Sequence, residues 1–114
     1  MVLVNFSHPM ENSQIARIEG MIEYKIDKVV STPAQFDLGK SLKPQVEQMI
    51  RDTGLSWQEW ADTVCLYPSL NFAAIIFAGI MNEELGFIPP MVRTAPVAGG
   101  FTRQFEVVEI VYFN

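Results

Sequence analysis

The segment from residue 63 to residue 86 limits the possible folds of this chain more than any other part of the sequence. It contains a short apolar run at 63–67, a turn at 68–71, and a helix-length run at 71–85 that is apolar nearly all round. A helix without a polar side is typical of a protein interior. We therefore expect residues 71–85 to pack in the middle of the molecule, beside a strand at 63–67.

The turn before this helix carries two polar side chains, Ser69 and Asn71, and both residue types are good helix N-caps. The first backbone N–H groups of a helix have no partner within it and carry partial positive charge, so anions bind there. The start of the helix, with Pro68, Ser69 and Asn71, is therefore a candidate anion site. The alternative is that Pro68 and Ser69 only turn the chain and cap the helix.

Composition restricts the possible partners. A chain of 114 residues is long enough for its own core, and we expect a single domain over residues 1–114. The net charge of −5 argues against DNA binding, because covering a duplex needs a surplus of Lys and Arg, whereas a small nucleotide needs only a local cation. Only 18% of the residues are charged and the mean hydropathy is +0.17, which favours a homodimer or a higher homo-oligomer.

No segment of the sequence predicts export or membrane insertion. The first six residues are too few for a signal peptide and lack a basic leader. The apolar run at 72–81 is too short to cross a bilayer, so we expect no membrane partner and a cytoplasmic protein. The single cysteine, Cys65, has apolar neighbours and is predicted to be a buried, inert thiol.

Short apolar runs alternate with helical patterns along the chain. We predict strands at residues 1–6, 24–30, 63–67, 91–97 and 103–113. Helices are expected to start at residue 12 or 13, after Ser41, at a Ser56 capping box and at residue 71, with Gly54 and Gly86 ending two of them. This order, with a turn at 98–100, predicts an α/β fold: a Rossmann-like, open and mostly parallel sheet, with helices on both faces and an antiparallel C-terminal strand.

Ligands of such sheets bind beyond the carboxyl ends of the strands, where the strand order reverses. If the order is 2-1-3-4-5, the reversal falls between the first and third strands. It then brings Ser7 and His8 beside Ser69 and Asn71. The sequence has no G-x-G-x-x-G after the first strand and no phosphate loop, so a standard dinucleotide or triphosphate site is not predicted.

The side chains expected at this edge suit a phosphodiester. The hydroxyls of Ser7 and Ser69 can bond phosphate oxygens together with backbone N–H groups. Asn71 can bond a base or a ribose, and Arg93 can clamp a phosphate with two parallel hydrogen bonds. His8, the only histidine, can transfer protons near neutral pH.

Two of these residues have plainer alternative roles. The His8 side chain can cap the turn before Pro9 without any ligand. Arg93 can form an ion pair with Glu106 or Glu109 across the C-terminal hairpin. The residue types at this edge leave both alternatives open.

Several motifs resemble one known group of proteins. They are MVLVNFSHP at 1–9, Gln35-Phe36-Asp37, YPSLN at 67–71, Gly86-Phe87-Ile88-Pro89 followed by Val92-Arg93, and EVVEI at 106–110. Over nearly the whole chain they are similar to small stand-alone CRISPR-associated proteins related to the CARF (CRISPR-associated Rossmann fold) and ring nuclease group. The resemblance implies a homodimer that binds a cyclic oligoadenylate, the second messenger of type III CRISPR defence, across its two-fold axis.

The resemblance also implies roles for individual residues. The residues that would contact the ring are Ser7, His8, Pro68, Ser69, Asn71 and Arg93. In a ring nuclease the ribose 2′-hydroxyl attacks the adjacent phosphorus and a 2′,3′-cyclic phosphate forms, so neither a metal nor another cofactor is needed. His8 would transfer the proton, and Ser69 and Arg93 would stabilise the charge.

Cleavage and capture of the ring stay open as alternatives. The first hypothesis is a metal-independent ring nuclease acting on cyclic tetra-adenylate, with slow turnover because no second acid or base is evident. The second is a non-catalytic protein that binds and sequesters the same ring. A third is an accessory assembly module that binds no nucleotide.

Overall fold

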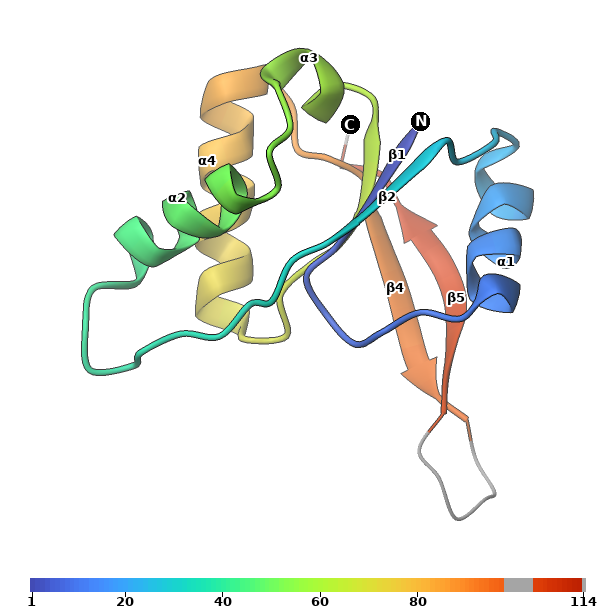
Figure 1. The fold of residues 1–114 in the computed structure, drawn as a ribbon, viewed down its shortest axis with the longest axis horizontal. Coiled ribbons are helices and arrows are strands. Elements are labelled where there is room, and N and C mark those ends of the chain that lie inside the picture. Colours follow the sequence, from blue (N-terminus) through green and yellow to red (C-terminus); the bar gives the residue numbers. More distant parts are fainter. Residues whose placement is uncertain (98–103, 114) are drawn as a thin grey trace.

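A computed structural model describes residues 1–97 and 104–113 of the chain (Figure 1). The strands in these ranges are β1 (Val2–Asn5), β2 (Lys28–Ser31), β3 (Thr63–Leu66), β4 (Met91–Pro96) and β5 (Phe105–Val111). The helices are α1 (Asn12–Ile22), α2 (Leu42–Asp52), α3 (Trp57–Trp60) and α4 (Asn71–Leu85). The predicted turn at 98–100 lies outside the described residues, as does the predicted start of the last strand at Arg103.

The strands form one sheet in the order β2-β1-β3-β4-β5. Strand β1 pairs in parallel with β2 and β3, β3 pairs in parallel with β4, and β5 runs antiparallel to β4. Helix α1 covers one face, and α2, α3 and α4 cover the other (Figure 1). The predicted Rossmann-like α/β fold, with its antiparallel C-terminal strand, is confirmed.

The two central strands supply side chains to the cores on both faces, because successive side chains of a strand point to opposite sides. Leu3 and Val64 face α1 and pack in one core with Ile18. Val4 and Cys65 face the other way and pack in the core under α2 and α4. Strands β1 and β3 are buried along their whole length, which explains why they read as nearly unbroken apolar runs.

An aromatic cluster fills the core between the sheet and α4. The ring of Phe77, at the middle of α4, lies 5.5 Å from Phe6, 5.8 Å from Trp60 and 4.9 Å from Tyr67, centroid to centroid. The contacts with Phe6 and Tyr67 are edge-to-face, the arrangement that the ring quadrupoles favour. These rings hold α4 to the sheet.

Strand β2 is shorter than the strand predicted at 24–30. The backbone N–H of Ile26 donates to the Glu19 carboxylate at 2.8 Å, and the N–H of Asp27 donates to the Met1 carbonyl at 2.9 Å. The bond to Glu19 takes Ile26 out of the ladder, so pairing with β1 begins at Lys28, opposite Val2. The alternating pattern at 24–27 therefore belongs to a loop that a side chain of α1 holds in place.

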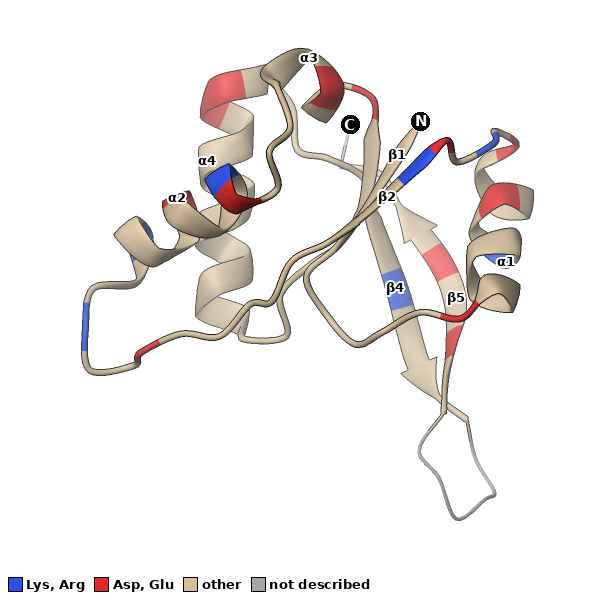
Figure 2. Cartoon of the chain, viewed as in Figure 1, with Lys and Arg blue, Asp and Glu red and all other residues tan. Residues whose placement is uncertain are grey.

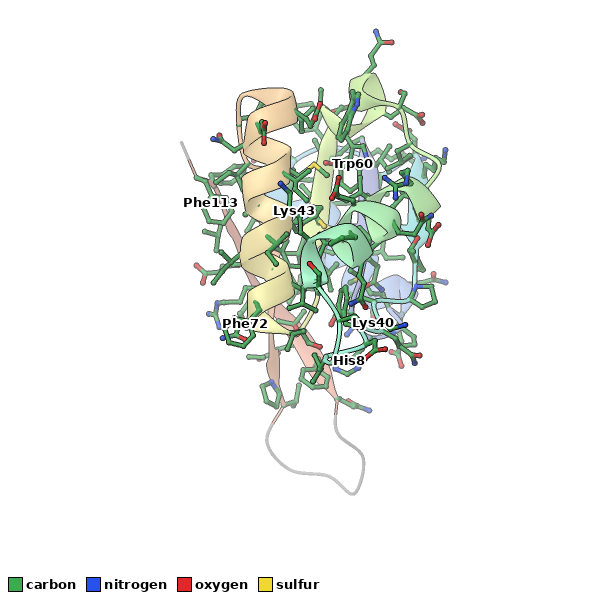
Figure 3. The ribbon with its side chains drawn as sticks, turned by 90° about the vertical axis from the view of Figure 1, so that its left-hand side faces the viewer. His8, Lys40, Lys43, Trp60, Phe72 and Phe113 are labelled. Atoms are coloured by element: carbon green, nitrogen blue, oxygen red, sulfur yellow. The ribbon has the colours of Figure 1, made fainter. Side chains whose placement is uncertain are left out.

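Helix α4 is not enclosed in the middle of the molecule, contrary to the prediction. Ala73, Phe77 and Met81 are buried on its inner side. On its outer side, however, Phe72 is 61% exposed and Ile75 is 68% exposed. The helices on this face form a single layer, and no described segment lies in front of α4 in Figure 3. An apolar helix is therefore only half covered.

Candidate ligand-binding site

Two hollows lie beyond the carboxyl ends of β1 and β3, where the strand order reverses. Their volumes are about 480 Å³ and about 240 Å³. Ser7, Leu66 and Thr94 line both of them, so the two hollows are adjacent. The larger opens on the α1 side of the sheet and the smaller on the α4 side. This is the edge at which the sequence places the candidate site.

The larger hollow lies between the N-terminal half of α1 and the start of β5. Its polar and charged lining includes His8, Glu11, Gln14, Arg17, Gln104 and Glu106. The His8 ring stacks on the ring of Phe105, with centroids 5.0 Å apart and planes 15° apart. The His8 side chain makes no hydrogen bond to any part of the chain that the structure describes, so it does not cap the turn. Its ring is instead an exposed platform.

Two side chains of α1 fix the start of β5 beside this hollow. The Gln14 amide nitrogen donates to the Phe105 carbonyl at 2.6 Å, and the Arg17 Nε donates to the Val107 carbonyl at 2.7 Å. Backbone carbonyls held by charged or amide donors are well fixed in position. The ring of Phe105 is therefore held in place under His8.

Asn5, at the end of β1, positions the loop that carries Ser7 and His8. Its side chain is only 3% exposed. The Asn5 Nδ2 donates to the His8 carbonyl at 2.8 Å, and its Oδ1 accepts the Ser7 N–H at 2.8 Å. This role of Asn5 was not predicted from the sequence. The sequence does contain a signal for it, because Asn5 is a polar residue at the end of an otherwise apolar strand. A buried carboxamide needs hydrogen-bond partners, and the loop that follows supplies them.

The smaller hollow lies between the end of β3, the start of α4 and β4. It brings together Ser7, Pro68, Ser69, Asn71 and Arg93, which the sequence analysis placed at one site. His8, the remaining residue of that set, lines only the larger hollow of the two. The set is therefore divided between two adjacent hollows that share Ser7.

Arg93 forms the ion pair across the C-terminal hairpin that the sequence left open as an alternative, and it also lines the smaller hollow. Its Nε forms an ion pair with the Glu109 carboxylate, and the two residues are register partners in the antiparallel pair of β4 and β5. Both side chains are 50% exposed. An ion pair with this exposure is weak, so a ligand phosphate can compete with Glu109 for the guanidinium.

Neither Ser69 nor Asn71 caps α4, contrary to the prediction. The N-cap is Leu70, whose carbonyl accepts the Ala74 N–H at 3.0 Å. Ser69 precedes the cap, and the Asn71 Oδ1 accepts the N–H of Phe72 at 2.9 Å. The N-cap position is the one from which a side chain usually accepts a first-turn N–H, and leucine has no acceptor to offer there. The Ser69 hydroxyl makes no hydrogen bond within the described residues.

The charges around the two hollows are mixed, as Figure 2 shows for β4, β5 and the start of α1. Among the described lining residues, the larger hollow has one basic side chain, Arg17, together with Glu11 and Glu106. The smaller has Arg93, which pairs with Glu109. A polyanion would gain little from such a field. Recognition here would rest on hydrogen bonds and stacking.

Burial keeps two other titratable side chains near this edge in their neutral form. Burial raises the pKa of the Tyr67 phenol, whose hydroxyl donates to the Pro89 carbonyl. Burial also raises the pKa of the Cys65 thiol, and the prediction that Cys65 is buried is confirmed. Neither side chain is an acid or a base for chemistry near neutral pH.

Thr94, Gln104 and Phe105 also line the site, and the sequence analysis missed all three. No local pattern marks them, because they reach this edge only through the pairing of β4 with β5. Phe105 in particular was interpreted only as part of an apolar last strand. Its contact with His8 joins residues that are far apart in the sequence.

The described residues contain no ready-made metal site. In residues 1–97 and 104–113, no group of three or more His, Cys, Asp or Glu side chains is arranged to hold an ion. In the same ranges no helix combines the length and the apolar composition that crossing a membrane requires. No protein-family model matches the chain, and no curated protein or solved structure matches it significantly.

Proposed function

We propose that this protein binds a cyclic oligoadenylate at the carboxyl edge of its sheet and holds the ring without rapid cleavage. The observation that carries the proposal is the pair of hollows that meet at Ser7, because they offer hydroxyl, carboxamide, guanidinium and aromatic groups on one continuous surface. Two motifs that resemble the CARF and ring nuclease group supply lining residues of this same surface: Ser7-His8-Pro9, and all of residues 67–71 except Leu70. A role in type III CRISPR defence would place the protein in the cytoplasm.

The two hollows suit different parts of such a ligand. In the smaller hollow, the Ser69 hydroxyl and the Arg93 guanidinium can bond phosphate oxygens. In the larger, an adenine can stack on the exposed ring of His8, which Phe105 supports from the other side. Stacking of a base on an aromatic ring contributes about 1–3 kcal/mol.

Capture fits the geometry better than rapid cleavage does. General acid–base catalysis needs the proton-transfer group within hydrogen-bond reach of the reacting atoms. His8 lies on the α1 side, whereas Ser69 and Arg93 lie on the α4 side. Arg93 is also engaged with Glu109. Among the described residues that line the smaller hollow, none has a side chain that transfers protons near neutral pH.

A slow, metal-independent ring nuclease is the second candidate, and one observation favours it. Asn5 holds Ser7 and His8 in a single loop, and Ser7 lines both hollows. A phosphate bonded to Ser7 would therefore lie near the His8 ring. The expected product is a linear oligoadenylate that ends in a 2′,3′-cyclic phosphate.

Thermal unfolding with cyclic tetra-adenylate in EDTA, followed by chromatography of the recovered nucleotide, tests both candidates. At a ligand concentration of about 100 Kd, binding adds about 2.7 kcal/mol, which raises the Tm of a domain of this size by roughly 10 °C. A raised Tm with an intact ring supports capture, and linear product supports the nuclease. An unchanged Tm with rings of every size tested would contradict both.

Three variants test whether the smaller hollow holds a phosphate. Arg93→Gln removes the clamp and should weaken binding about 10- to 100-fold, the effect of one lost charged hydrogen bond. Arg51→Gln is the matched control, because Arg51 is an exposed residue in the last turn of α2 and lines neither hollow. Glu109→Gln should strengthen binding, since it frees Arg93 and removes a negative charge. Equal Kd values for all three would contradict a phosphate at Arg93.

A further inference from the structure

The place where the two hollows meet is lined by Ser7, Leu66 and Thr94. Leu66 ends β3 and is only 5% exposed, so it forms an apolar floor. The hydroxyls of Ser7 and Thr94 make no hydrogen bond within the residues that the structure describes. We call Ser7, Leu66 and Thr94 the junction. The side chains of the junction carry no charge, in contrast to those on either side of it.

Strand β4 continues past the end of its neighbour β3 at the junction. The two strands pair at a single position, and β4 then runs on beside β5 alone (Figure 1). In an antiparallel pair, alternate residues direct their backbone groups at the partner strand. The Val97 N–H bonds the Gln104 carbonyl, so the backbone groups of Thr94, three residues earlier, point away from β5. The extra residue of the bulge, Val108, lies in β5, so it does not interrupt this alternation along β4.

The Thr94 peptide groups therefore point to the space beyond the end of β3. Within the described residues, neither its N–H nor its carbonyl has a backbone partner on that side. Backbone N–H and C=O groups need hydrogen-bond partners, which here must come from solvent or from a ligand. Thr94 thus presents a hydroxyl, an N–H and a carbonyl at the junction.

The proposed ligand places a different part of a nucleotide in each hollow, and the present inference rests on that proposed function. A base stacked on His8 lies in the larger hollow, and a phosphate bonded by Ser69 and Arg93 lies in the smaller one. The ribose joins base and phosphate covalently, so it must cross the junction. Its carbon atoms then lie over the apolar floor, and its hydroxyl groups lie beside uncharged donors and acceptors.

We propose that Thr94 binds the ribose 2′-hydroxyl and makes the site selective for ribonucleotides over deoxyribonucleotides. A 2′-hydroxyl both donates and accepts hydrogen bonds, and it is the group by which a protein distinguishes RNA from DNA. The Thr94 hydroxyl also does both, so the two hydroxyls can bond in either direction. Neither His8 nor Arg93 can make this distinction, because the base and the phosphate are the same in both kinds of ligand.

Titration calorimetry with cyclic tetra-adenylate and its 2′-deoxy analogue tests the contact. The wild-type chain should bind the ribose ring about 3- to 10-fold more tightly for each ribose so held, the effect of one uncharged hydrogen bond. Thr94→Val keeps the shape of the side chain without its hydroxyl and should bring the two Kd values together. Thr94→Ser keeps the hydroxyl and should keep the preference. Both rings are chromatographed after the titration, so that cleavage of the ribose ring is not mistaken for weak binding.

Ser31→Ala is the matched control, because it also removes a hydroxyl from the end of a strand. Ser31 is exposed, ends β2 and lines neither hollow. Its preference for the ribose ring should equal that of the wild type. Valine and threonine are both β-branched and favour strands, so Thr94→Val should leave β4 and the Tm of the free protein unchanged.

Equal affinity of the wild type for the two rings would overturn the inference and leave the proposed binding of cyclic oligoadenylate intact. A ribose preference that survives in Thr94→Val would do the same. A preference that is also lost in Ser31→Ala would show that it does not arise at Thr94. Binding of neither ring to the wild type would contradict the proposed function itself, and this inference with it.

Discussion

The helices on the two sides of the sheet are attached to it by different kinds of contact. On the α1 side, Gln14 and Arg17 bind the carbonyls of β5 at 2.6 and 2.7 Å, and a hollow of about 480 Å³ remains between helix and strand. On the α4 side, the ring of Phe77 packs against three other aromatic rings, and the hollow at its edge is about 240 Å³. Long polar side chains can bridge a gap, whereas aromatic rings fill it. The roomier part of the site therefore lies where the fold depends on polar anchors.

The largest expected effect is loss of the aromatic packing. Phe77→Ala should lower the free energy of unfolding by about 3–5 kcal/mol, because it removes a fully buried ring and leaves a cavity. Ile18→Ala, the matched truncation on the α1 side, should cost less, near the lower end of about 2–5 kcal/mol. Urea unfolding of both variants measures the difference. A larger cost for Ile18→Ala would show that aromatic packing is not what makes the α4 side the more tightly held of the two.

Asn5, beneath the point where the two hollows meet, should show the next largest effect. Asn5→Ala removes both hydrogen bonds of a buried carboxamide and should cost about 1–3 kcal/mol. It should also lower the Tm gain from cyclic tetra-adenylate, since Ser7 and His8 lose their support. Asn12→Ala, at an exposed position in the first turn of α1, should change stability by less than about 0.5 kcal/mol. Equal effects of the two variants in urea unfolding would argue against a positioning role.

A smaller effect should follow from cutting a polar anchor on the α1 side. Arg17→Ala removes the bond to the Val107 carbonyl and should cost about 1 kcal/mol. It should also speed amide hydrogen exchange in β5. Arg51→Ala is the control, because within the described residues the Arg51 side chain bonds only the Gln48 side chain of its own helix. If the amides of β5 exchanged no faster in Arg17→Ala than in Arg51→Ala, the hydrogen bond from Arg17 would not contribute to the stability of β5.

The smallest effect concerns Glu59, a peripheral polar contact on the α4 side. A hydrogen bond from the Ser56 N–H, and then the nearby Lys28, hold the pKa of the Glu59 carboxyl below its ordinary value of 4.5. A lowered folded-state pKa means that the stabilisation is present above pH 4.5 and is lost as the pH falls through the folded-state value. Glu59→Gln should therefore be slightly less stable than the wild type at neutral pH and equal to it in strong acid. A stability gap that widens on acidification would contradict this assignment.

Much of the fold follows from interactions between residues close together in the sequence. The Ser56 capping box and the ends of α2 and α4 at Gly54 and Gly86 are as predicted, because caps involve residues within a few positions. The order of strands and helices also follows from local periodicity. The predicted capping of α4 failed by a single residue, since the helix begins at Asn71 with Leu70 as its cap.

The candidate site was predictable only where it is made of loops that follow strands. Ser7 and Ser69 each come shortly after the end of a central strand, so the topology alone brings them to one edge. The division of the site into two hollows was not predictable, because it depends on which side of the sheet each loop turns to. That choice separates His8 from Ser69.

The α/β class, the alternation of strands with helices and the edge where the loops meet all follow from the sequence, because hydrophobic period and turn chemistry act locally. The positions of Phe105 under His8 and of Arg93 opposite Glu109, and the uncovered side of α4, come from tertiary packing. The first two depend on strand register, and the third depends on how many layers cover the sheet. Strand register and the number of layers cannot be predicted from the residues near those positions, since both arise from packing between segments far apart in the chain.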